Sequence, residues 1–193
     1  MLKKNFSEEI LRPNWREYLE LTEKDPRYVA FIARDIHDKI VAVLRCNVAN
    51  NDDRAMLEEH AGIRDAHDYF NFKTIYLLPE AQRRGIGREM LYTAITSPIA
   101  SKCNKIFTET LLGYNVSSKF FDKFGAHEIG RYETDPAEHY GLLSENQVGK
   151  LISIIREMEK QKILLTIRDS ISWSPASLGH ACPNTARPRS LEQ

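Results

Sequence analysis

The chain has 193 residues, and 27 Lys and Arg balance 27 Asp and Glu, so its formal charge at neutral pH is zero. This length indicates one domain, and the charge balance argues against a strongly basic nucleic-acid binder and a disordered acidic chain. No run reaches the roughly 18 apolar residues of a transmembrane helix, and the N-terminus lacks the apolar stretch of a secretory signal. Three widely spaced cysteines, Cys46, Cys103 and Cys182, suit reduced structural thiols, so we expect a cytoplasmic protein.

The first part of the chain predicts helices, then a hairpin. Residues 7–11 and 15–24 have helical patterns separated by Pro13. Two runs rich in strand formers, 28–33 and 39–45, lie on either side of a turn at 35–38 and therefore predict a β-hairpin.

The segment 48–70 is strongly acidic. It holds six Asp and Glu against Arg54 and Arg64, a local charge of −4, and we expect a helix over 54–60. His60 and His67 leave a metal site open as an interpretation, but their spacing lacks the repeat that helix or hairpin ligands show. The favoured interpretation is a solvated acidic loop with a helix in it, and no metal is predicted.

The strongest strand pattern is 72–78, which Pro79 ends. The elements expected after it alternate helix and strand and end in two strands: 86–95, 105–111, 116–124, 127–133 and 138–143. Ser144 with Gln147 resembles a capping box that opens a helix over 145–170. The apolar face of that helix either forms a homodimer or packs across the chain's own sheet, and residues 171–193 read as an irregular tail.

The segment between strand 72–78 and helix 86–95 carries the chemistry. A helix N-terminus leaves backbone N–H groups unpaired and has a partial positive charge. Gly85 and Gly87 let a ligand approach the backbone closely, and arginines 83, 84 and 88 add cationic donors. These features predict a site for a phosphate-bearing ligand. A Walker loop is excluded because no Gly-Lys-Ser/Thr follows, and a dinucleotide fingerprint needs a third glycine.

The residues Gln-Arg-Arg-Gly-Ile-Gly at 82–87 resemble the acyl-CoA pyrophosphate loop, Q/R-x-x-G-x-G/A, of the GNAT N-acetyltransferase superfamily. The resemblance covers roughly residues 28–143. It implies an α/β fold: a GNAT-like domain over 1–144 with a central mixed, mostly antiparallel sheet flanked by helices, extended by the C-terminal helix 145–170. It also implies acetyl-CoA as the acyl donor, held around the loop by Leu77, Leu78, Gln82, Arg83, Arg84, Gly85, Ile86, Gly87 and Arg88.

Residues 115–126 resemble the family's helix beside the CoA pantetheine, which implies that Asn115, Ser118 and Phe121 contact the cofactor. The chain departs from the family pattern at Phe121, because the family's frequent Tyr there is taken to protonate the leaving thiolate. Phe121 has no ionisable hydroxyl. The nearest hydroxyl candidates are Tyr114, Ser117 and Ser118, and we take Tyr114 as the catalytic candidate.

The resemblance further implies direct attack of an amine on the thioester, without a covalent nucleophile. Such a reaction needs a deprotonated amine, a polarised carbonyl and neutralisation of the thiolate. We expect a backbone N–H near Leu77 or Leu78 to polarise the carbonyl. We expect Glu109, in strand 105–111, to be the general base, although a strand carboxylate can also simply face solvent.

Two functions follow from these observations. The first is an N-acetyltransferase that moves the acetyl group of acetyl-CoA to a small-molecule amine or a lysine side chain. The acidic segment 48–70 would then favour a cationic acceptor. The alternative is a CoA-binding module without catalysis, which serves as a sensor or interaction subunit. Phe121 and the long helix 145–170 motivate it.

Overall fold

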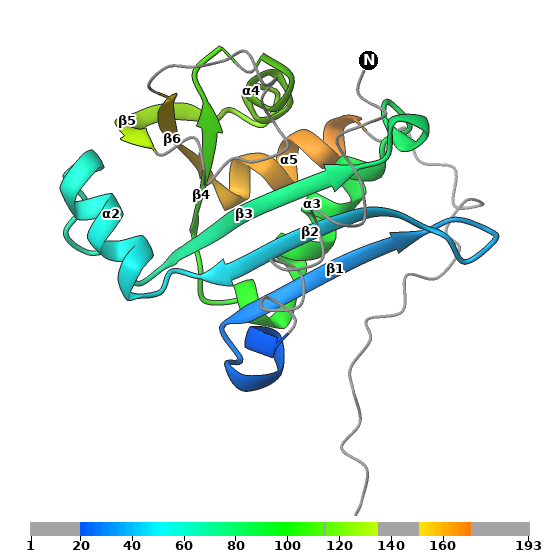
Figure 1. Cartoon of the computed structure of the whole chain (residues 1–193), viewed down its shortest axis with the longest axis horizontal. Coiled ribbons are helices and arrows are strands. Elements are labelled where there is room, and N and C mark those ends of the chain that lie inside the picture. Colours follow the sequence, from blue (N-terminus) through cyan, green and yellow to red (C-terminus); the bar gives the residue numbers. More distant parts are fainter. Residues whose placement is uncertain (1–19, 114, 135–150, 171–193) are drawn as a thin grey trace, which may run out of the picture.

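A single sheet organises the computed structural model, which describes residues 20–113, 115–134 and 151–170. The strands are β1 (Tyr28–Arg34), β2 (Ile40–Val48), β3 (Tyr69–Leu77), β4 (Lys105–Leu111), β5 (His127–Thr134) and β6 (Leu151–Glu159). They pair in the order β1-β2-β3-β4-β6-β5 (Figure 1). Only β3 and β4 run parallel, and the other neighbours are antiparallel. The expected mixed, mostly antiparallel sheet is confirmed, as is the β1–β2 hairpin.

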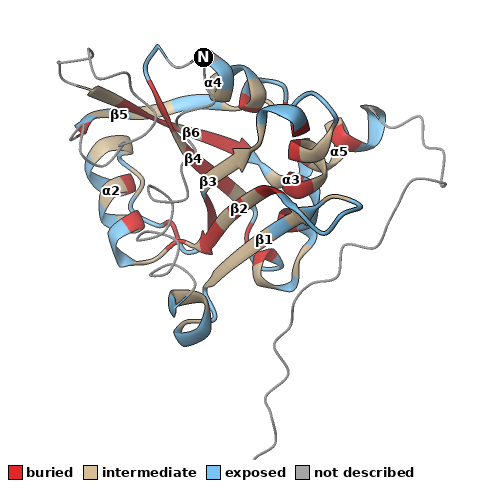
Figure 2. Ribbon diagram, turned by 45° about the vertical axis from the view of Figure 1, so that its right-hand side comes forward, coloured by how far each residue is buried: buried red, intermediate tan, exposed pale blue. Residues whose placement is uncertain are grey.

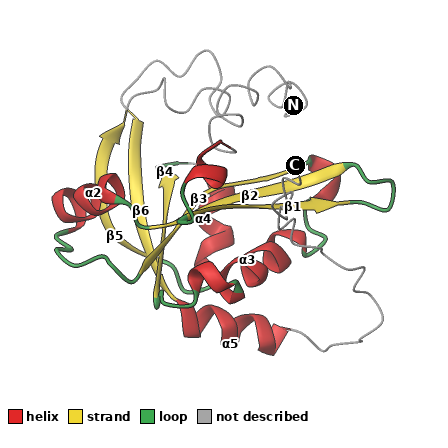
Figure 3. Cartoon of the chain, turned by 90° about the horizontal axis from the view of Figure 1, so that it is seen from below, coloured by secondary structure: helices red, strands yellow, loops and turns green. Residues whose placement is uncertain are grey.

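Helices cover both faces of the sheet. They are α2 (Asn51–Ala61), α3 (Ile86–Thr96), α4 (Asn115–Asp122) and α5 (Lys160–Ser170), with 3-10 turns η1 (Pro79–Ala81) and η2 (Pro98–Ala100). α3 and α5 contact each other on one face, here called the α3 face, and α4 adds side chains to the core there. α2 packs against β5 on the opposite face, the α2 face (Figure 3). The sheet therefore separates two hydrophobic clusters, one beneath α3 and α5 and one beneath α2.

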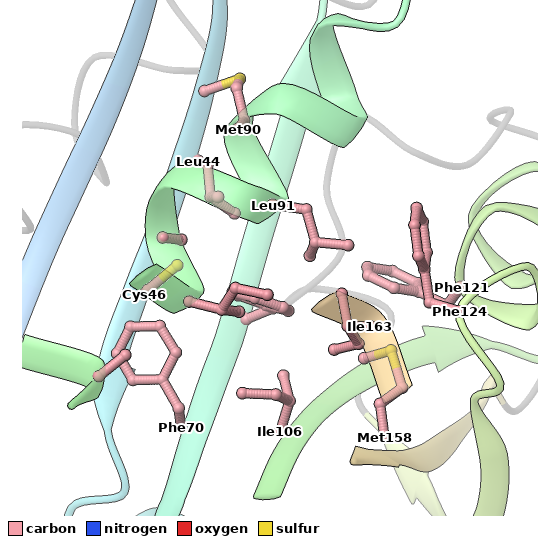
Figure 4. Close-up of a cluster of buried hydrophobic side chains, with 14 of the residues drawn as sticks. Leu44, Cys46, Phe70, Met90, Leu91, Ile106, Phe121, Phe124, Met158 and Ile163 are labelled. Carbon is pink, nitrogen blue, oxygen red and sulfur yellow. The ribbon is translucent and has the colours of Figure 1, made fainter. Parts of the chain in front are cut away.

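Strand alternation divides the buried side chains between these faces. On the α3 face, Leu44, Phe70 and Ile106 are at most 1% exposed and belong to one core with Leu91 of α3 (Figure 4). On the α2 face, Phe107 belongs to a smaller cluster beneath α2. Buried positions accordingly follow the central strands (Figure 2). Each such side chain contributes about 1.5–3 kcal/mol to stability.

The prediction of one helix over 145–170 is wrong for residues 151–159, which form β6 between β4 and β5. Because this strand is covered on both faces, Ile154, Ile155 and Met158 are all buried. A strand buried on both sides has a near-continuous apolar run, and that run also satisfies a helical period. The helix is real only in α5, whose Ile163 and Ile167 pack into the chain's own core. Of the two alternatives for the apolar face, packing within the chain is the one observed.

Several expectations fall outside the described residues: helix 7–11, strand 138–143, the cap at Ser144 and Gln147, Tyr114 and the tail 171–193. Of the expected helix 15–24, residues 20–24 are described and are helical. Among the described residues, no helix is long and apolar enough to cross a membrane.

A polar link ties the first residues of β3 and β4 to β6. The hydroxyl of Tyr69 in β3 donates to Glu157 of β6, and Nζ of Lys105 in β4 lies 2.8 Å from Oε1 of the same carboxylate. Burial by itself raises the pKa of Glu157, but the hydrogen bonds from Lys105 and Tyr69 outweigh burial and lower this pKa below its ordinary value. The three strands are thus held together at this end of the sheet.

This link predicts an acid-sensitive contribution to stability. Because the pKa of Glu157 is lowered in the folded chain, the stabilisation is complete above the ordinary Glu value of 4.5 and is lost as the pH falls below it. Urea unfolding of Glu157→Gln between about pH 7 and pH 3 should show a lower free energy of unfolding than wild type at neutral pH, by about 1–3 kcal/mol. The variant should also lose less stability on acidification. Glu58→Gln, at an exposed position of α2, should keep the wild-type pH dependence; equal slopes for wild type and Glu157→Gln would contradict the assignment.

Candidate active site

The parallel pairing of β3 with β4 covers only part of each strand. It runs from Tyr69 opposite Lys105 to Phe72 opposite Thr108, where the Thr108 hydroxyl donates to the Phe72 carbonyl at 2.9 Å. Beyond this point the two strands diverge (Figure 1). We call the diverging stretches, residues 73–77 of β3 and 109–111 of β4, the split. The split leaves two strand edges within the sheet that are not paired with each other.

A β-bulge lies where the split begins. Arg45 of β2 is opposite Thr74, whereas the next residue, Cys46, is opposite Phe72, so Lys73 is an extra residue in β3. A bulge bends a strand and increases its twist, and bulges are common next to active sites. The bulge at Lys73 therefore accounts for the turn of β3 away from β4.

The backbone at the end of β3 faces two directions. The Leu78 N–H donates to the Val41 carbonyl at 2.9 Å, so it is directed toward β2. Because successive residues of a strand direct their N–H groups to opposite sides, the Leu77 N–H is directed toward the split. Consistently, the Gln82 side-chain amide donates to the Leu77 carbonyl at 3.3 Å. Of the two backbone donors predicted from sequence, Leu77 has the suitable direction, and the N–H of Leu78 is engaged by β2.

The glycine loop after β3 leads directly into α3. Gly85 precedes the helix with φ +83°, a left-handed conformation that favours glycine, and Arg83 in the loop also has a positive φ of +60°. The Glu89 N–H donates to the Gly85 carbonyl at 3.1 Å, which begins the helical ladder. The N–H groups of Ile86 and Gly87 therefore precede the first intrahelical bond, in the position that helix N-termini offer to anions.

Gly87 lies between the loop, β3 and α4. A Cβ at this position would be 3.2 Å from the Phe120 ring of α4 and 3.8 Å from Cδ1 of Ile75 in β3. The N-terminal turn of α3 thus adjoins the split. Arg83 and Arg84 are exposed, and Nη2 of Arg88 lies 3.6 Å from Glu89 Oε1. Three arginines therefore surround the turn whose N–H groups are directed outward.

α4 places one aromatic side chain beside this turn and another in the core. Phe120 packs against Gly87, whereas Phe121 is 3% exposed and lies in the core close to Met158 and Ile163 (Figure 4). Ser118 is half-buried on the same helix. Tyr114 and the side chain of Asn115 lie outside the described residues, so the predicted cofactor contacts on this helix stay predictions.

Glu109 is the first residue of β4 beyond the last pair with β3, and its side chain lies on the α2 face. The Tyr132 hydroxyl of β5 donates to Glu109 Oε2, and Lys73 Nζ lies 3.6 Å from Oε1. The Glu109 side chain is 19% exposed. The carboxylate therefore lies where the split begins, with one neutral hydrogen-bond donor, the Tyr132 hydroxyl, and one cation, Lys73, next to it.

His60 of α2 completes this cluster. Its ring stacks on Tyr132 with centroids 4.6 Å apart and planes 13° apart. Gly130 permits the close approach of α2, because a Cβ there would overlap the His60 carbonyl oxygen. Sequence reasoning missed both Tyr132 and His60 as neighbours of Glu109. No local spacing connects them, because three separate elements bring them together.

Family comparison agrees with this arrangement. The model of the acetyltransferase (GNAT) family matches residues 1–126, which is more than half of the chain. The chain belongs to the GNAT acetyltransferase family. No curated protein sequence matches this GNAT chain.

Solved structures of other acetyltransferases share the fold. The ribosomal-protein-alanine N-acetyltransferase of Brucella melitensis is 14% identical with a TM-score of 0.54, and the match covers 76% of each chain. The spermidine/spermine N-acetyltransferase of Vibrio cholerae is 17% identical with a TM-score of 0.52, over 78% of this chain and 77% of that one. A Bacillus anthracis protein described as a streptothricin acetyltransferase, in complex with acetyl coenzyme A, is 18% identical with a TM-score of 0.52, over 77% and 69%. At these identities the similarity shows the fold alone.

The acidic segment of this GNAT chain divides into buried and exposed groups. Asp53 is 5% exposed and accepts hydrogen bonds from the side-chain amides of Asn47 at 2.5 Å and Asn71 at 2.9 Å. With Asn50 it also forms the capping box that begins α2. Asp53 is thus part of the framework, whereas the other acidic residues of α2 are exposed: Asp52, Glu58 and Glu59.

The two histidines of the acidic segment and the two cysteines of the described residues show no arrangement typical of a metal site or a nucleophile. His67 Nδ1 lies 3.0 Å from Nη1 of Arg54, and the described residues contain no group of three His, Cys, Asp or Glu that could hold a metal ion. Cys46 and Cys103 are free thiols, each at most 1% exposed. Burial raises the pKa of both thiols, so neither has the thiolate character of a nucleophile.

Proposed function

We propose that the chain transfers the acetyl group of acetyl-CoA to a primary amine by direct attack in a ternary complex at the split. The observation that carries the proposal is the end of β3–β4 pairing between a glycine loop and a carboxylate. The loop supports binding of the donor, and Glu109 supports activation of the acceptor. Family membership supports the reaction class.

The donor would bind on the α3 face. Its pyrophosphate suits the N–H groups at the start of α3, where three arginines supply positive charge. From there the pantetheine would follow the split beside α4. The proposed cofactor-binding residues are those of the sequence analysis: Leu77, Leu78, Gln82, Arg83, Arg84, Gly85, Ile86, Gly87, Arg88, Asn115, Ser118 and Phe121.

The thioester would lie in the split with its carbonyl oxygen near the Leu77 N–H. Glu109 would take a proton from the amine, whose nitrogen attacks the carbonyl carbon as the carbon–sulfur bond breaks. With Phe121 in the core and without a hydroxyl, Tyr114 is the proposed proton donor to the thiolate. Holding the two substrates together supplies roughly 7–11 kcal/mol in ideal cases, so modest acid–base assistance is compatible with activity.

The acceptor would approach from the α2 face, because the Glu109 side chain lies on that side. The exposed acidic residues of α2 support a cationic acceptor. Two structural neighbours carry names that describe acetylation of spermidine or spermine and of streptothricin. The buried thiols of Cys46 and Cys103 support the expected cytoplasmic location.

Gly87→Glu tests the donor site. The new side chain would collide with Phe120 and place negative charge beside the pyrophosphate position. We expect calorimetry to show an acetyl-CoA affinity at least about 100-fold weaker, equivalent to ~2.7 kcal/mol. Thr93→Glu adds the same charge at an exposed position later in α3 and should bind normally. Unchanged binding in a folded Gly87→Glu chain would contradict the loop assignment.

Glu109→Gln tests the catalytic role. Removing a general base lowers kcat by about 10²–10⁴-fold, while acetyl-CoA affinity should stay unchanged because the loop is intact. The assay follows thiol release from acetyl-CoA with a mixed library of amines, and Glu128→Gln on β5 is the control. Wild-type chain that binds acetyl-CoA but turns over no amine would favour the non-catalytic module instead. Chain that does not bind acetyl-CoA would contradict both functions.

A further inference from the structure

We propose that Lys73 is itself an acetyl acceptor, modified in cis by acetyl-CoA bound to the same chain. The proposal rests on the proposed function, because it uses the same donor and the same base. It adds a covalent modification site that becomes occupied when no external amine is present.

The position of Lys73 motivates the proposal. Lys73 is the bulged residue of β3 and the first residue after the last pair with β4, and Glu109 is its counterpart on β4. Nζ of Lys73 lies 3.6 Å from Glu109 Oε1, so the amine reaches across the base of the split. The Lys73 side chain is 48% exposed, which leaves it room to change rotamer.

The contacts of Glu109 place the Lys73 ammonium at the position that an acceptor amine would have to reach. Tyr132 donates to Oε2, and Lys73 is the cation next to Oε1. If Glu109 is the base, an acceptor amine must approach this carboxylate before it loses a proton. Lys73 Nζ therefore occupies the place of an acceptor amine, within the same chain that holds the thioester.

The reaction balances with groups already named. The Lys73 ammonium gives one proton to Glu109, and the neutral nitrogen attacks the acetyl carbonyl carbon. An amide bond forms as the carbon–sulfur bond breaks, and the second proton leaves nitrogen while the CoA thiolate is protonated. The products are Nε-acetyl-Lys73, CoA thiol and one proton released from Glu109 to water, so no further reactant is needed.

Three other described lysines lie outside the split and away from Glu109. Nζ of Lys105 lies within 2.8 Å of both Glu157 and Glu159, at the paired end of β4. Nζ of Lys160 donates to the Ala100 carbonyl at 2.7 Å. Lys102 is exposed in the turn before β4. A purely structural role for the Lys73–Glu109 pair predicts no acetylation of Lys73.

The experiment incubates the full chain with acetyl-CoA alone and follows each lysine by peptide mass spectrometry. We expect Lys73 to be acetylated at least about tenfold faster than Lys102, because the bound thioester and the amine are held together. The rate constant should be independent of protein concentration, as a reaction in cis requires. Equal rates at Lys73 and Lys102, or a Lys73 rate that rises with protein concentration, would overturn the proposal.

Three variants assign the cause of the modification. Gly87→Glu should acetylate Lys73 no faster than Lys102, while Thr93→Glu should behave as wild type. Glu109→Gln should slow Lys73 acetylation and leave the slow chemical acetylation of Lys102 unchanged. If wild-type chain acetylates free amines but leaves Lys73 unmodified, only this inference fails. If it neither turns over amines nor modifies Lys73, the proposed function fails with it.

Discussion

Hydrogen bonding between β3 and β4 stops after Phe72 and Thr108, and the candidate site depends on this interruption. The divergence is not fraying, because each strand keeps its outer partner along the split. β3 remains paired with β2 as far as Leu77, and β4 remains paired with β6 as far as Leu111. Two rigid edges with backbone groups directed inward can therefore accept an extended ligand that has amide groups of its own.

The glycine loop and the Glu109 cluster lie on opposite faces of the sheet. On the α3 face, the loop and α4 bring backbone N–H groups and arginines to one end of the split. On the α2 face, Gly130 lets α2 approach β5 closely enough for His60 to stack on Tyr132, which bonds to Glu109. In the proposed reaction an anionic donor and an amine acceptor would therefore bind on opposite sides of one layer and meet where β3 and β4 have separated.

The features that could be predicted are those that depend on residues close together in the sequence. The hairpin, α3, β4 and the glycine loop each have a local signature. Glu109 as the general base stays a prediction, which rests on the expected place of its strand beside the thioester. Tyr132 and His60 were not identified, because their proximity to Glu109 depends on the packing of α2 on β5. β6 was mistaken for helix because Ile154 and Ile155 are buried on opposite faces, which erases the alternation typical of a strand.

The position of β6 in the sheet has a consequence for biosynthesis. β6 is the last of the described strands in the sequence, yet it lies between β4 and β5, which are synthesised before it. Neither strand can obtain this partner until residue 159 has emerged from the ribosome, so until then β4 has β3 as its neighbour on one side only and β5 lacks its pairing with β6. Among the described helices and strands, only α5 follows β6, so the pairing of β4 with β6 along the split forms after all the other described elements have been translated.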